Sequence, residues 1–353
     1  MILPTSQLYV LILLVVSMVC CALWPSLFKS ATRWRFELFQ YDLAWGFALA
    51  AVVAAFTLGM WNSKELTFQD NFLLTGYRNI GWAIGAGIAL CFASITLMGG
   101  VTISGMSVAY PLAFGVAWAM LAVWDFMANT QISALLTFSG AAAVVVSGIL
   151  AMIAQLWYLQ TIANEAAAML HADPRLKPAK QTAPNQAIGF VLSILSGLAI
   201  GGFFRCTYES GFGENGMSSY SVVLMAALGF VAGAAGIVPF FLYFPVKGAP
   251  LQVRHYFRGT PKHHVLGVLG GMLLAVAVLA GLVATSVPVA QQIAPIERYL
   301  MGRSAPIAAV VLGLMVWKEF SEAATRVKAM VAASVVLMAL GMSIIAFAPF
   351  YGK

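Results

Sequence analysis

Residues 265–287, VLGVLGGMLLAVAVLAGLVATSV, form an uninterrupted apolar run without a charged side chain. A helix needs about 20 such residues to cross the hydrocarbon core of a bilayer, so the run predicts a membrane-spanning helix near residues 264 to 288. Working outward in both directions, we find further apolar stretches near residues 8 to 28, 43 to 61, 79 to 98, 105 to 123, 138 to 159, 187 to 204, 219 to 244, 304 to 317 and 328 to 348. The sequence therefore predicts an all-α polytopic membrane protein with ten transmembrane helices.

The composition supports a protein that lives in lipid. Only 9% of the residues are charged and 61% are hydrophobic, whereas water-soluble domains carry about 25% charged residues. The formal net charge of +7 comes from basic residues scattered over the connectors, which predicts contacts with anionic lipid headgroups and no nucleic-acid partner. The four cysteines show no metal-type spacing, so we expect free thiols and no disulfide.

The basic residues also predict an orientation. Most of the nineteen Lys and Arg residues fall on the first, third, fifth, seventh and ninth connectors: Lys29, Arg33, Arg35, Arg175, Lys177, Lys180, Lys247, Arg254, Arg258, Lys262, Lys318, Arg326 and Lys328. Basic residues near span ends are retained in the cytoplasm. We therefore expect this face to be cytoplasmic and both termini to be outside, in a plasma membrane or bacterial inner membrane. The first apolar stretch follows residues 1 to 7, which contain no Lys or Arg, and is expected to remain as a helix.

The two halves of the chain share a weak repeat that recurs in the same order. Residues 24–30 (WPSLFKS) align with residues 204–210 (FRCTYES). Further on, residues 107–118 (SVAYPLAFGVAW) align with residues 302–313 (GRSAPIAAVVLG), and a Trp with charged neighbours follows each. Five spans per half is an odd number, so the halves must enter the membrane with opposite orientation. Such inverted repeats are typical of secondary transporters.

An inverted repeat predicts alternating access, because two similar halves of opposite orientation can exchange conformations around a shared site. We expect the first five-helix repeat in residues 1–159, a cytoplasmic linker in 160–186 and the second five-helix repeat in 187–353. Three G-x-x-x-G pairs predict close helix contacts, either as sliding surfaces or as static packing: Gly197 with Gly201, Gly229 with Gly233, and Gly267 with Gly271.

Three segments carry a resemblance to a known family: WRFELFQYDLAWGFALAAVVAAFTLG at residues 34–59, ISGMSVAYPLAFGVA at 103–117 and SAPIAAVVLGLMVWKEF at 304–320. They resemble the ureide permease and glucose/ribose porter branches of the drug/metabolite transporter superfamily. The resemblance implies a ten-helix bundle with a central cavity lined mainly by the first, third, fourth, sixth, eighth and ninth helices. It also implies transport: ureide permeases take up allantoin and related purine or pyrimidine compounds, commonly with protons, while relatives move sugars or export metabolites and drugs.

The richest candidate site lies at the end of the sixth span. Ionisable groups there are candidates because a charge in hydrocarbon costs at least a few kcal/mol without a partner. Arg205, Tyr208 and Glu209 are spaced to share one helix face beside Phe204. The Arg-Glu pair is interpreted either as a gated pair that a proton or solute breaks, or as an interfacial pair with the tyrosine among the headgroups.

Two further sets of polar groups could hold a solute. Trp24 and Pro25 occupy the corresponding place in the first half, where a proline can free backbone carbonyls; the alternative is an aromatic belt residue beside a terminal proline. Ser104, Ser107 and Tyr110 open the fourth span with hydroxyls at helical spacing. Serines also pack between membrane helices, so both interpretations stay open for this set. Lesser candidates are Trp82, Ser94 and Gln291, while Lys29 accompanies Trp24 and Pro25, and Asn129 accompanies Asp125.

If protons drive transport, the titrating group is expected to be a carboxylate, because His171, His255, His263 and His264 all fall in predicted cytoplasmic connectors. Glu209 is the first choice for proton coupling and Asp125 the second, although Asp125 could instead terminate its helix among solvated headgroups. Burial raises the pKa of a carboxyl group and a neighbouring arginine lowers it, so the sequence leaves the direction open.

We expect a transporter and no enzyme or cofactor. Residues 211–216 (GFGENG) match a dinucleotide pattern but lie between two spans with no strand before them. The first expectation is proton-coupled uptake of a small polar solute such as a ureide, nucleobase or sugar. The alternatives are an exporter of amphiphilic metabolites or drugs and a non-transporting membrane sensor or partner, and a homodimer is also considered. A cavity wall rich in polar groups would favour the first class, and an apolar aromatic wall would favour amphiphiles.

Overall fold

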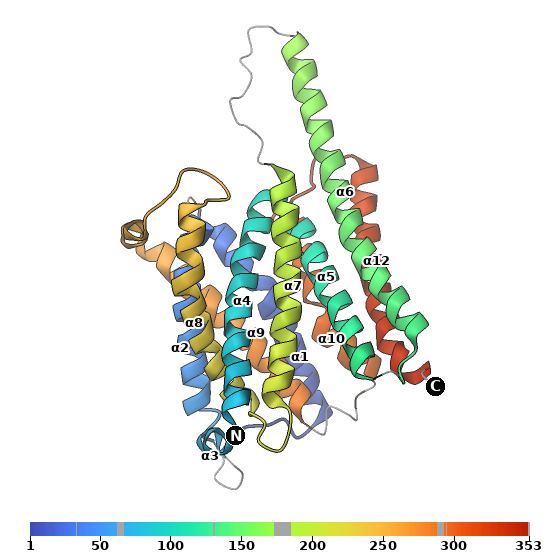
Figure 1. Cartoon of the computed structure of the whole chain (residues 1–353). Coiled ribbons are helices and arrows are strands. Elements are labelled where there is room, and N and C mark those ends of the chain that lie inside the picture. The colour runs from blue at the N-terminus through green and yellow to red at the C-terminus, as the bar shows by residue number, and fades with distance from the viewer. Residues whose placement is uncertain are drawn as a thin grey trace.

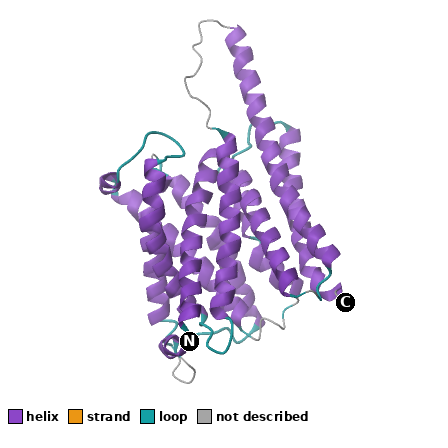
Figure 2. Cartoon of the chain, in the orientation of Figure 1, coloured by secondary structure: helices purple, strands orange, loops and turns teal. Residues whose placement is uncertain are grey.

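The computed structural model describes residues 1–32, 34–61, 67–129, 131–172, 185–287, 293 and 295–351. All regular elements in these residues are helices (Figure 2). In chain order they are α1 (Gln7–Ser30), α2 (Phe36–Phe56), α3 (Phe68–Leu74), α4 (Tyr77–Ser104), α5 (Met106–Ala128), α6 (Ala134–Ala172), α7 (Gln186–Gly211), α8 (Ser219–Tyr243), η1 (Val253–Arg258), α9 (Pro261–Ser286), α10 (Pro295–Arg303), α11 (Ala305–Met315), α12 (Thr325–Phe347) and η3 (Ala348–Tyr351).

Within the described residues, nine helices are long and apolar enough to cross a membrane: α1, α2, α4, α5, α6, α7, α8, α9 and α12. Figure 1 shows these long helices running side by side in one bundle. Their apolar outer surfaces cannot be covered by water without a large free-energy cost. The chain is therefore an integral, multi-pass membrane protein.

The bundle has two ends that we call lower and upper, as they stand in Figure 1. Both chain termini lie at the lower end, where the amide of Ile2 donates to the carbonyl of Leu58 at 2.9 Å and the amide of Ser133 donates to the carbonyl of Ala348 at 3.1 Å. The upper end holds the ends of α1, α4, α6 and α8 and the starts of α2, α5, α7, α9 and α12. At this end a single residue, Gly105, joins α4 to α5 with φ of 81°, a conformation that favours glycine.

The predicted span at 304–317 differs from the structure. Ser304 separates α10 from α11, and α11 has only 11 residues. At 1.5 Å per residue this helix rises roughly 17 Å, well short of a hydrocarbon core of about 30 Å. Pro306 explains the break, because proline lacks the amide that would continue a helix and is favoured in the first turn of a new one.

The predicted start of the second span is also wrong. The sequence predicts a span at 43–61, but α2 begins at Phe36. Glu37, Gln40 and Asp42 therefore lie inside a membrane-length helix, and all three are buried. Their charged and amide groups suggested a connector, whereas partners on neighbouring segments make their burial tolerable.

Two connectors also differ from expectation. The helix α6 continues to Ala172 and projects beyond the bundle at the upper end (Figure 1), so the first part of the predicted linker at 160–186 is helical. The rest of that linker, from 173 to 184, lies outside the described residues. His263 and His264 belong to the first turn of α9 and not to a connector, and the short helix α3 was not foreseen.

The G-x-x-x-G pairs lie at helix contacts, as predicted. A Cβ atom added to Gly197 would lie 2.2 Å from a carbonyl oxygen of α5. The same atom on Gly229 would lie 2.0 Å from a carbonyl oxygen of α4, and on Gly271 it would lie 2.1 Å from a carbonyl oxygen of α2. Any side chain at these positions would force the backbones apart, so the glycines set the spacing of the bundle.

Candidate functional site

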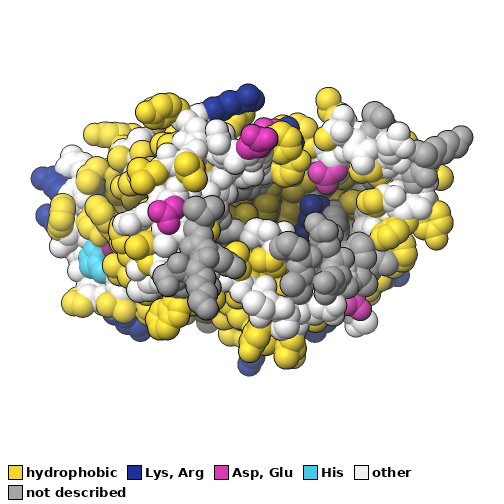
Figure 3. Space-filling model, turned by 90° about the horizontal axis from the view of Figure 1, so that it is seen from below, with side chains coloured by type: hydrophobic (Ala, Val, Ile, Leu, Met, Phe, Trp, Pro, Cys, Tyr) yellow, Lys and Arg dark blue, Asp and Glu magenta, His cyan; other side chains and the backbone are white. Residues whose placement is uncertain are grey.

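A cavity of about 490 Å³ lies between the helices and opens at the lower end. Its walls come from α1, α4, α5, α7 and α9, together with Arg303 and the start of α11, and the lower ends of α6 and α12 contribute to its rim. Figure 3, which views the molecule from below, shows this hollow with yellow hydrophobic side chains around it. The wall helices are the first, third, fourth, sixth and eighth predicted spans, with the start of the ninth.

One face of α5 supplies a row of aromatic rings to the wall. Tyr110, Phe114 and Trp118 follow one another at intervals of four residues, which places them on one side of the helix. The centroids of successive rings lie 5.4 Å apart, and Phe204 of α7 continues the row at 5.4 Å from Trp118. We call these four residues the aromatic row. The Tyr110, Phe114 and Trp118 side chains are buried and pack on one another. Phe204 is half-buried and is the ring of the row on which a flat solute can stack.

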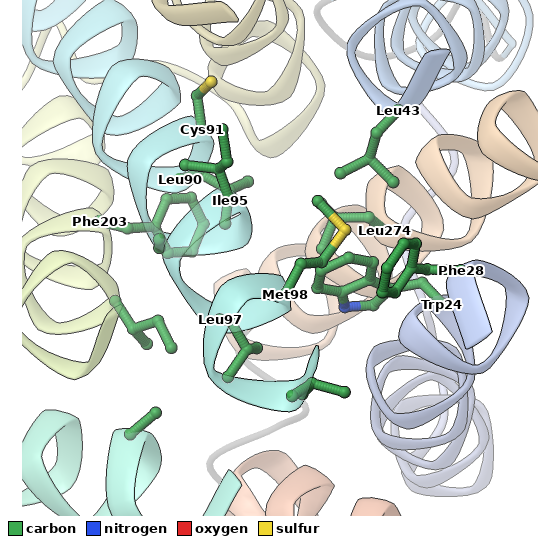
Figure 4. Packing of buried hydrophobic residues seen from close by; sticks show 14 of the residues in the cluster. Trp24, Phe28, Leu43, Leu90, Cys91, Ile95, Leu97, Met98, Phe203 and Leu274 are labelled. Carbon is green, nitrogen blue, oxygen red and sulfur yellow. The ribbon is translucent and has the colours of Figure 1, made fainter. Parts of the chain in front are cut away.

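Packed apolar side chains close the inner end of the cavity. Figure 4 shows Trp24 and Phe28 of α1 converging with Met98 of α4 and Leu274 of α9. All four are buried, and Trp24 and Leu274 also line the cavity. This packing separates the cavity from the upper end.

The hydroxyl groups of the wall already donate to backbone carbonyls. Ser17 donates to a carbonyl of α9 at 2.6 Å, Ser94 to a carbonyl of its own helix at 2.9 Å and the Tyr110 hydroxyl to a carbonyl of α1 at 3.1 Å. Each oxygen can still accept a hydrogen bond. The wall is thus apolar and aromatic, with a few acceptors and little donor capacity.

Charged groups stand near the mouth of the cavity. Asp125 and Arg303 both line it, and the guanidinium of Arg303 lies 5.2 Å from the ring centroid of Trp118. The Trp118 side chain is buried, and its indole nitrogen has no hydrogen-bond partner among the described residues. A solute entering from the lower end therefore passes one acidic and one basic side chain before it reaches the rings.

The upper end of the cavity helices is held by a charged contact. Glu319, which follows α11, accepts hydrogen bonds from the Lys29 ammonium at 2.5 Å and from the backbone amides of Met106 and Ser107 at 2.8 Å each. The Lys29 ammonium also lies 4.8 Å from the centroid of the Trp317 ring. One carboxylate thus connects the end of α1, the start of α5 and the segment after α11.

The buried polar groups of α2 have partners of their own. Gln40 donates to the hydroxyl of Ser94, at 2.8 Å, behind the cavity wall. Asp42 accepts a hydrogen bond from Tyr256 at 2.6 Å and lies 2.9 Å from a ring nitrogen of His264. The second cluster joins α2, η1 and the start of α9 at the upper end.

The structure brings part of the predicted site together. Trp24, Tyr110, Phe204 and Asp125 line the cavity, as does the lesser candidate Ser94. Trp24, Tyr110 and Phe204 belong to the apolar wall, and Asp125 belongs to the mouth of the cavity. The sequence predicted these residues but not which part of the cavity each one lines.

Other predicted residues lie away from the cavity lining. Pro25 is buried within α1, and Ser104 donates to the amide oxygen of Gln186 at 3.2 Å. Ser107 is fully buried and its amide binds Glu319. These three residues serve helix packing and the upper contact in this conformation.

The predicted cluster on α7 forms as an ion pair beside the cavity. Arg205 pairs with Glu209 along the helix, as the spacing predicted, and its guanidinium lies 5.3 Å from the Tyr208 ring centroid. The Tyr208 side chain is exposed, which agrees with the interfacial interpretation. Asn129 is exposed at the end of α5. Of the lesser candidates, Trp82 is half-buried on α4, and Gln291 lies outside the described residues.

Sequence reasoning missed Glu319, Trp118 and Arg303 as site residues. Trp118 could have been found, because it extends the four-residue spacing of Tyr110 on α5. In the sequence, Glu319 is notable only as one of the charged residues that follow Trp317 in the segment that repeats Trp124 and Asp125. Its contact with α5 spans more than two hundred residues of sequence, so no local pattern reveals it.

The described residues offer no group of three His, Cys, Asp or Glu side chains that could hold a metal ion. All four cysteines lie in this part of the chain and are free thiols, as predicted.

Comparisons of the chain with protein-family models, curated proteins and solved structures return no match. The geometry of the cavity and its two ends is therefore what bears on function.

Proposed function

We propose that this protein is a secondary transporter that moves a small solute across the membrane by alternating access. The observation that carries the proposal is the difference between the two ends of the cavity. The lower end is open, while buried aromatic packing and the Lys29–Glu319 contact hold the upper end shut. A cavity of solute size, open to one side only, is what one half of a transport cycle requires.

The packing of the helices supports two inverted five-helix repeats. The exchange pairs α1 with α7, α2 with α8, α4 with α9, α5 with α11 and α6 with α12. It turns the α4–α7 contact into the α9–α1 contact. The same exchange turns the α4–α8 contact into the α9–α2 contact, and both members of each pair are present. In this scheme α11, with α10 before it, takes the place of the ninth span.

Glycines follow the same exchange. At the α4–α8 contact, Gly87 and Gly229 each face a carbonyl of the other helix. At the α2–α9 contact, Gly46 and Gly271 do the same. Equivalent close contacts in two halves support a mechanism in which the halves exchange roles.

Phe204, the half-buried ring of the aromatic row, favours a planar, uncharged ring with polar edges, such as a nucleobase or ureide, over a sugar. Stacking of a base on an aromatic side chain contributes about 1–3 kcal/mol. The charged groups at the mouth, Asp125 and Arg303, would bind the polar edges. This choice agrees with the resemblance to ureide permeases, which itself remains a proposal.

An amphiphilic metabolite or drug is the second candidate, and it is the class that an apolar, aromatic wall of this kind favours. It is favoured by the engaged hydroxyl donors of the wall, since a cavity with few free donors binds an apolar body at little cost. Export of such a molecule would use the same cavity in the opposite direction.

We place the lower end outside the cell, in the plasma membrane or bacterial inner membrane. Basic residues around the upper end support this orientation, which makes the described conformation outward-open and suits uptake. Coupling to protons would use Asp125 or Glu209. Membrane lipids surround the protein, and a homodimer is compatible with its apolar outer surface.

Transport can be tested with the purified full-length protein in liposomes loaded with unlabelled solute. We expect exchange of labelled uracil or allantoin to exceed that of glucose or ribose. Trp118→Leu should raise KM roughly tenfold, because it removes the ring that holds Phe114 and Phe204 in position in the cavity wall. Trp45→Leu makes the same chemical change at a tryptophan exposed on the outside of α2 and should leave KM unchanged.

The outcome separates the candidates. Exchange of amphiphilic dyes without exchange of any polar ring compound would favour the second candidate. Binding of a solute without any flux, in vesicles with the protein in either orientation, would contradict transport and favour a sensor.

A further inference from the structure

We propose that the Lys29–Glu319 ion pair, seated on the first turn of α5, is the latch that keeps the upper end of the cavity closed. The inference rests on the proposed transport function and names the contact that must break before the cavity can open to the other side. We call Lys29, Glu319 and the amides of Met106 and Ser107 the upper latch.

The latch is built for a carboxylate. One oxygen of Glu319 binds Lys29 and the amide of Met106, and the other binds the amide of Ser107. These amides belong to the N-terminus of α5, where the helix dipole favours a negative charge. Charge-assisted bonds of this kind are stronger than neutral ones, and the Glu319 side chain is only 12% exposed.

The surrounding backbone leaves space for this side chain and little else. A Cβ atom on Gly105 would lie 3.0 Å from the Glu319 carboxyl group, and one on Gly313 would lie 2.8 Å from a carboxylate oxygen. Lys318 adopts φ of 52°, which is uncommon for a residue other than glycine. This turn ends α11 and directs Glu319 back onto α5, so the segment after α11 is shaped to deliver the carboxylate.

The position of the latch connects it to the cavity. It joins α1, α5 and the end of α11, and all three helices contribute to the cavity wall. Below it, the Trp317 indole donates to the Ser26 hydroxyl at 3.2 Å, and Tyr110 of the aromatic row lies one helical turn beyond Ser107. Separating α1 from α5 at the upper end would therefore break the latch first.

Other ion pairs of the described residues do not have this placement. Arg35 with Glu37 and Arg205 with Glu209 join near neighbours along the chain. Asp42 with His264 joins α2 to α9, away from the α1–α5 boundary. The upper latch thus joins cavity helices from the two proposed repeats at the upper end, whereas Arg303 and Arg205 contact Trp118 and Trp124 across the same boundary at the lower end.

The latch can be tested by measuring from which side of the membrane one native thiol reacts. Cys21 lines the cavity, so replacing Cys20, Cys91 and Cys206 with Ala leaves it as a single reporter in the full-length protein. A membrane-impermeant maleimide is applied to one side of sealed vesicles at a time. In the parent we expect labelling from the lower side, with slow labelling from the upper side.

Glu319→Gln keeps the shape of the side chain but removes its charge. It should raise the rate of labelling from the upper side about tenfold and lower the rate from the lower side. Lys29→Met should change both rates in the same directions but by a smaller factor, because the α5 amides still bind the Glu319 carboxylate. Glu322→Gln changes an exposed residue three positions away and should leave both rates unchanged.

Opposite changes on the two sides distinguish a latch from mere loosening. Equal acceleration from both sides in Glu319→Gln would overturn the latch, and so would unchanged rates in both Glu319→Gln and Lys29→Met. If the parent still exchanges solute in that case, the transport proposal survives the loss of the latch. If neither the parent nor any variant is labelled from the upper side and no solute is exchanged, both proposals fail together.

Discussion

At the scale of single residues, Glu319 combines a buried site with partners that keep it charged. Burial raises the pKa of its carboxyl group, but Lys29 and the amides of Ser107 and Met106 lower it by more, so the pKa lies below the ordinary value of 4.5. The group therefore stays ionised near neutral pH. Protons would not open the upper latch under those conditions, and hydration or solute binding would have to do so.

This shift predicts how stability depends on pH. A lowered folded-state pKa contributes stability that is fully present well above pH 4.5 and is lost as the pH falls through the folded value. We expect Glu319→Gln to reduce stability by about 2 kcal/mol at pH 7, with the difference from wild type shrinking below about pH 4. Thermal unfolding of the wild type and Glu319→Gln in detergent between pH 3.5 and 7 measures this difference in stability. A difference that stays constant over this range would contradict the assignment.

The two acidic candidates for proton coupling can now be ranked by position. Asp125 lines the cavity mouth, whereas Glu209 is paired with Arg205 on α7. The sequence favoured Glu209, but a group that senses solute and proton together should lie on the cavity wall. We expect Asp125→Asn to reduce uptake driven by a pH gradient at least tenfold while preserving solute exchange at equal pH. Glu209→Gln should retain most of the driven uptake, and the reverse order would restore Glu209 as the coupling residue.

At the scale of helices, glycines decide how closely the bundle packs. Gly229 of α8 faces a carbonyl of α4, where even a methyl group would approach to 2.0 Å. Gly236 lies on the same helix, and a methyl group added there would meet no atom within 4 Å among the described residues. The two positions therefore make a matched pair, with the same residue and helix but opposite surroundings.

We expect Gly229→Ala to destabilise the protein by roughly 1–3 kcal/mol through overpacking. Gly236→Ala should be neutral or slightly stabilising, because alanine favours the helix. Thermal unfolding of both variants in one detergent provides the comparison. Equal effects of the two substitutions would show that the α4–α8 contact is looser than the structure has it.

At the scale of the whole molecule, both termini lie at the lower end (Figure 1), and we place that end outside the cell. Epitope tags on the two termini should therefore both be reached by antibody in intact spheroplasts, while a tag in the connector between α8 and α9 should require permeabilisation. The connector tag serves as the internal control. If antibody reached the two terminal tags from opposite sides of the membrane, the chain could not cross the membrane an even number of times.

The sequence by itself determined the class of protein and most of its spanning helices. Long apolar runs are sufficient for this, because a bilayer leaves only hydrogen-bonded helices or closed barrels as solutions for the backbone. It also predicted the close glycine contacts and the Arg205–Glu209 pair, since both depend on spacing within one helix. Local geometry carries such predictions.

Only the tertiary structure decided where polar groups find their partners. The start of α2 was misplaced because Glu37 and Asp42 look like connector residues until Arg35 and His264 are seen beside them. The upper latch was missed for the same reason, since Lys29 and Glu319 are 290 residues apart in sequence. The free energy of a buried charge depends on partners brought close by the fold, and that information is absent from any local pattern.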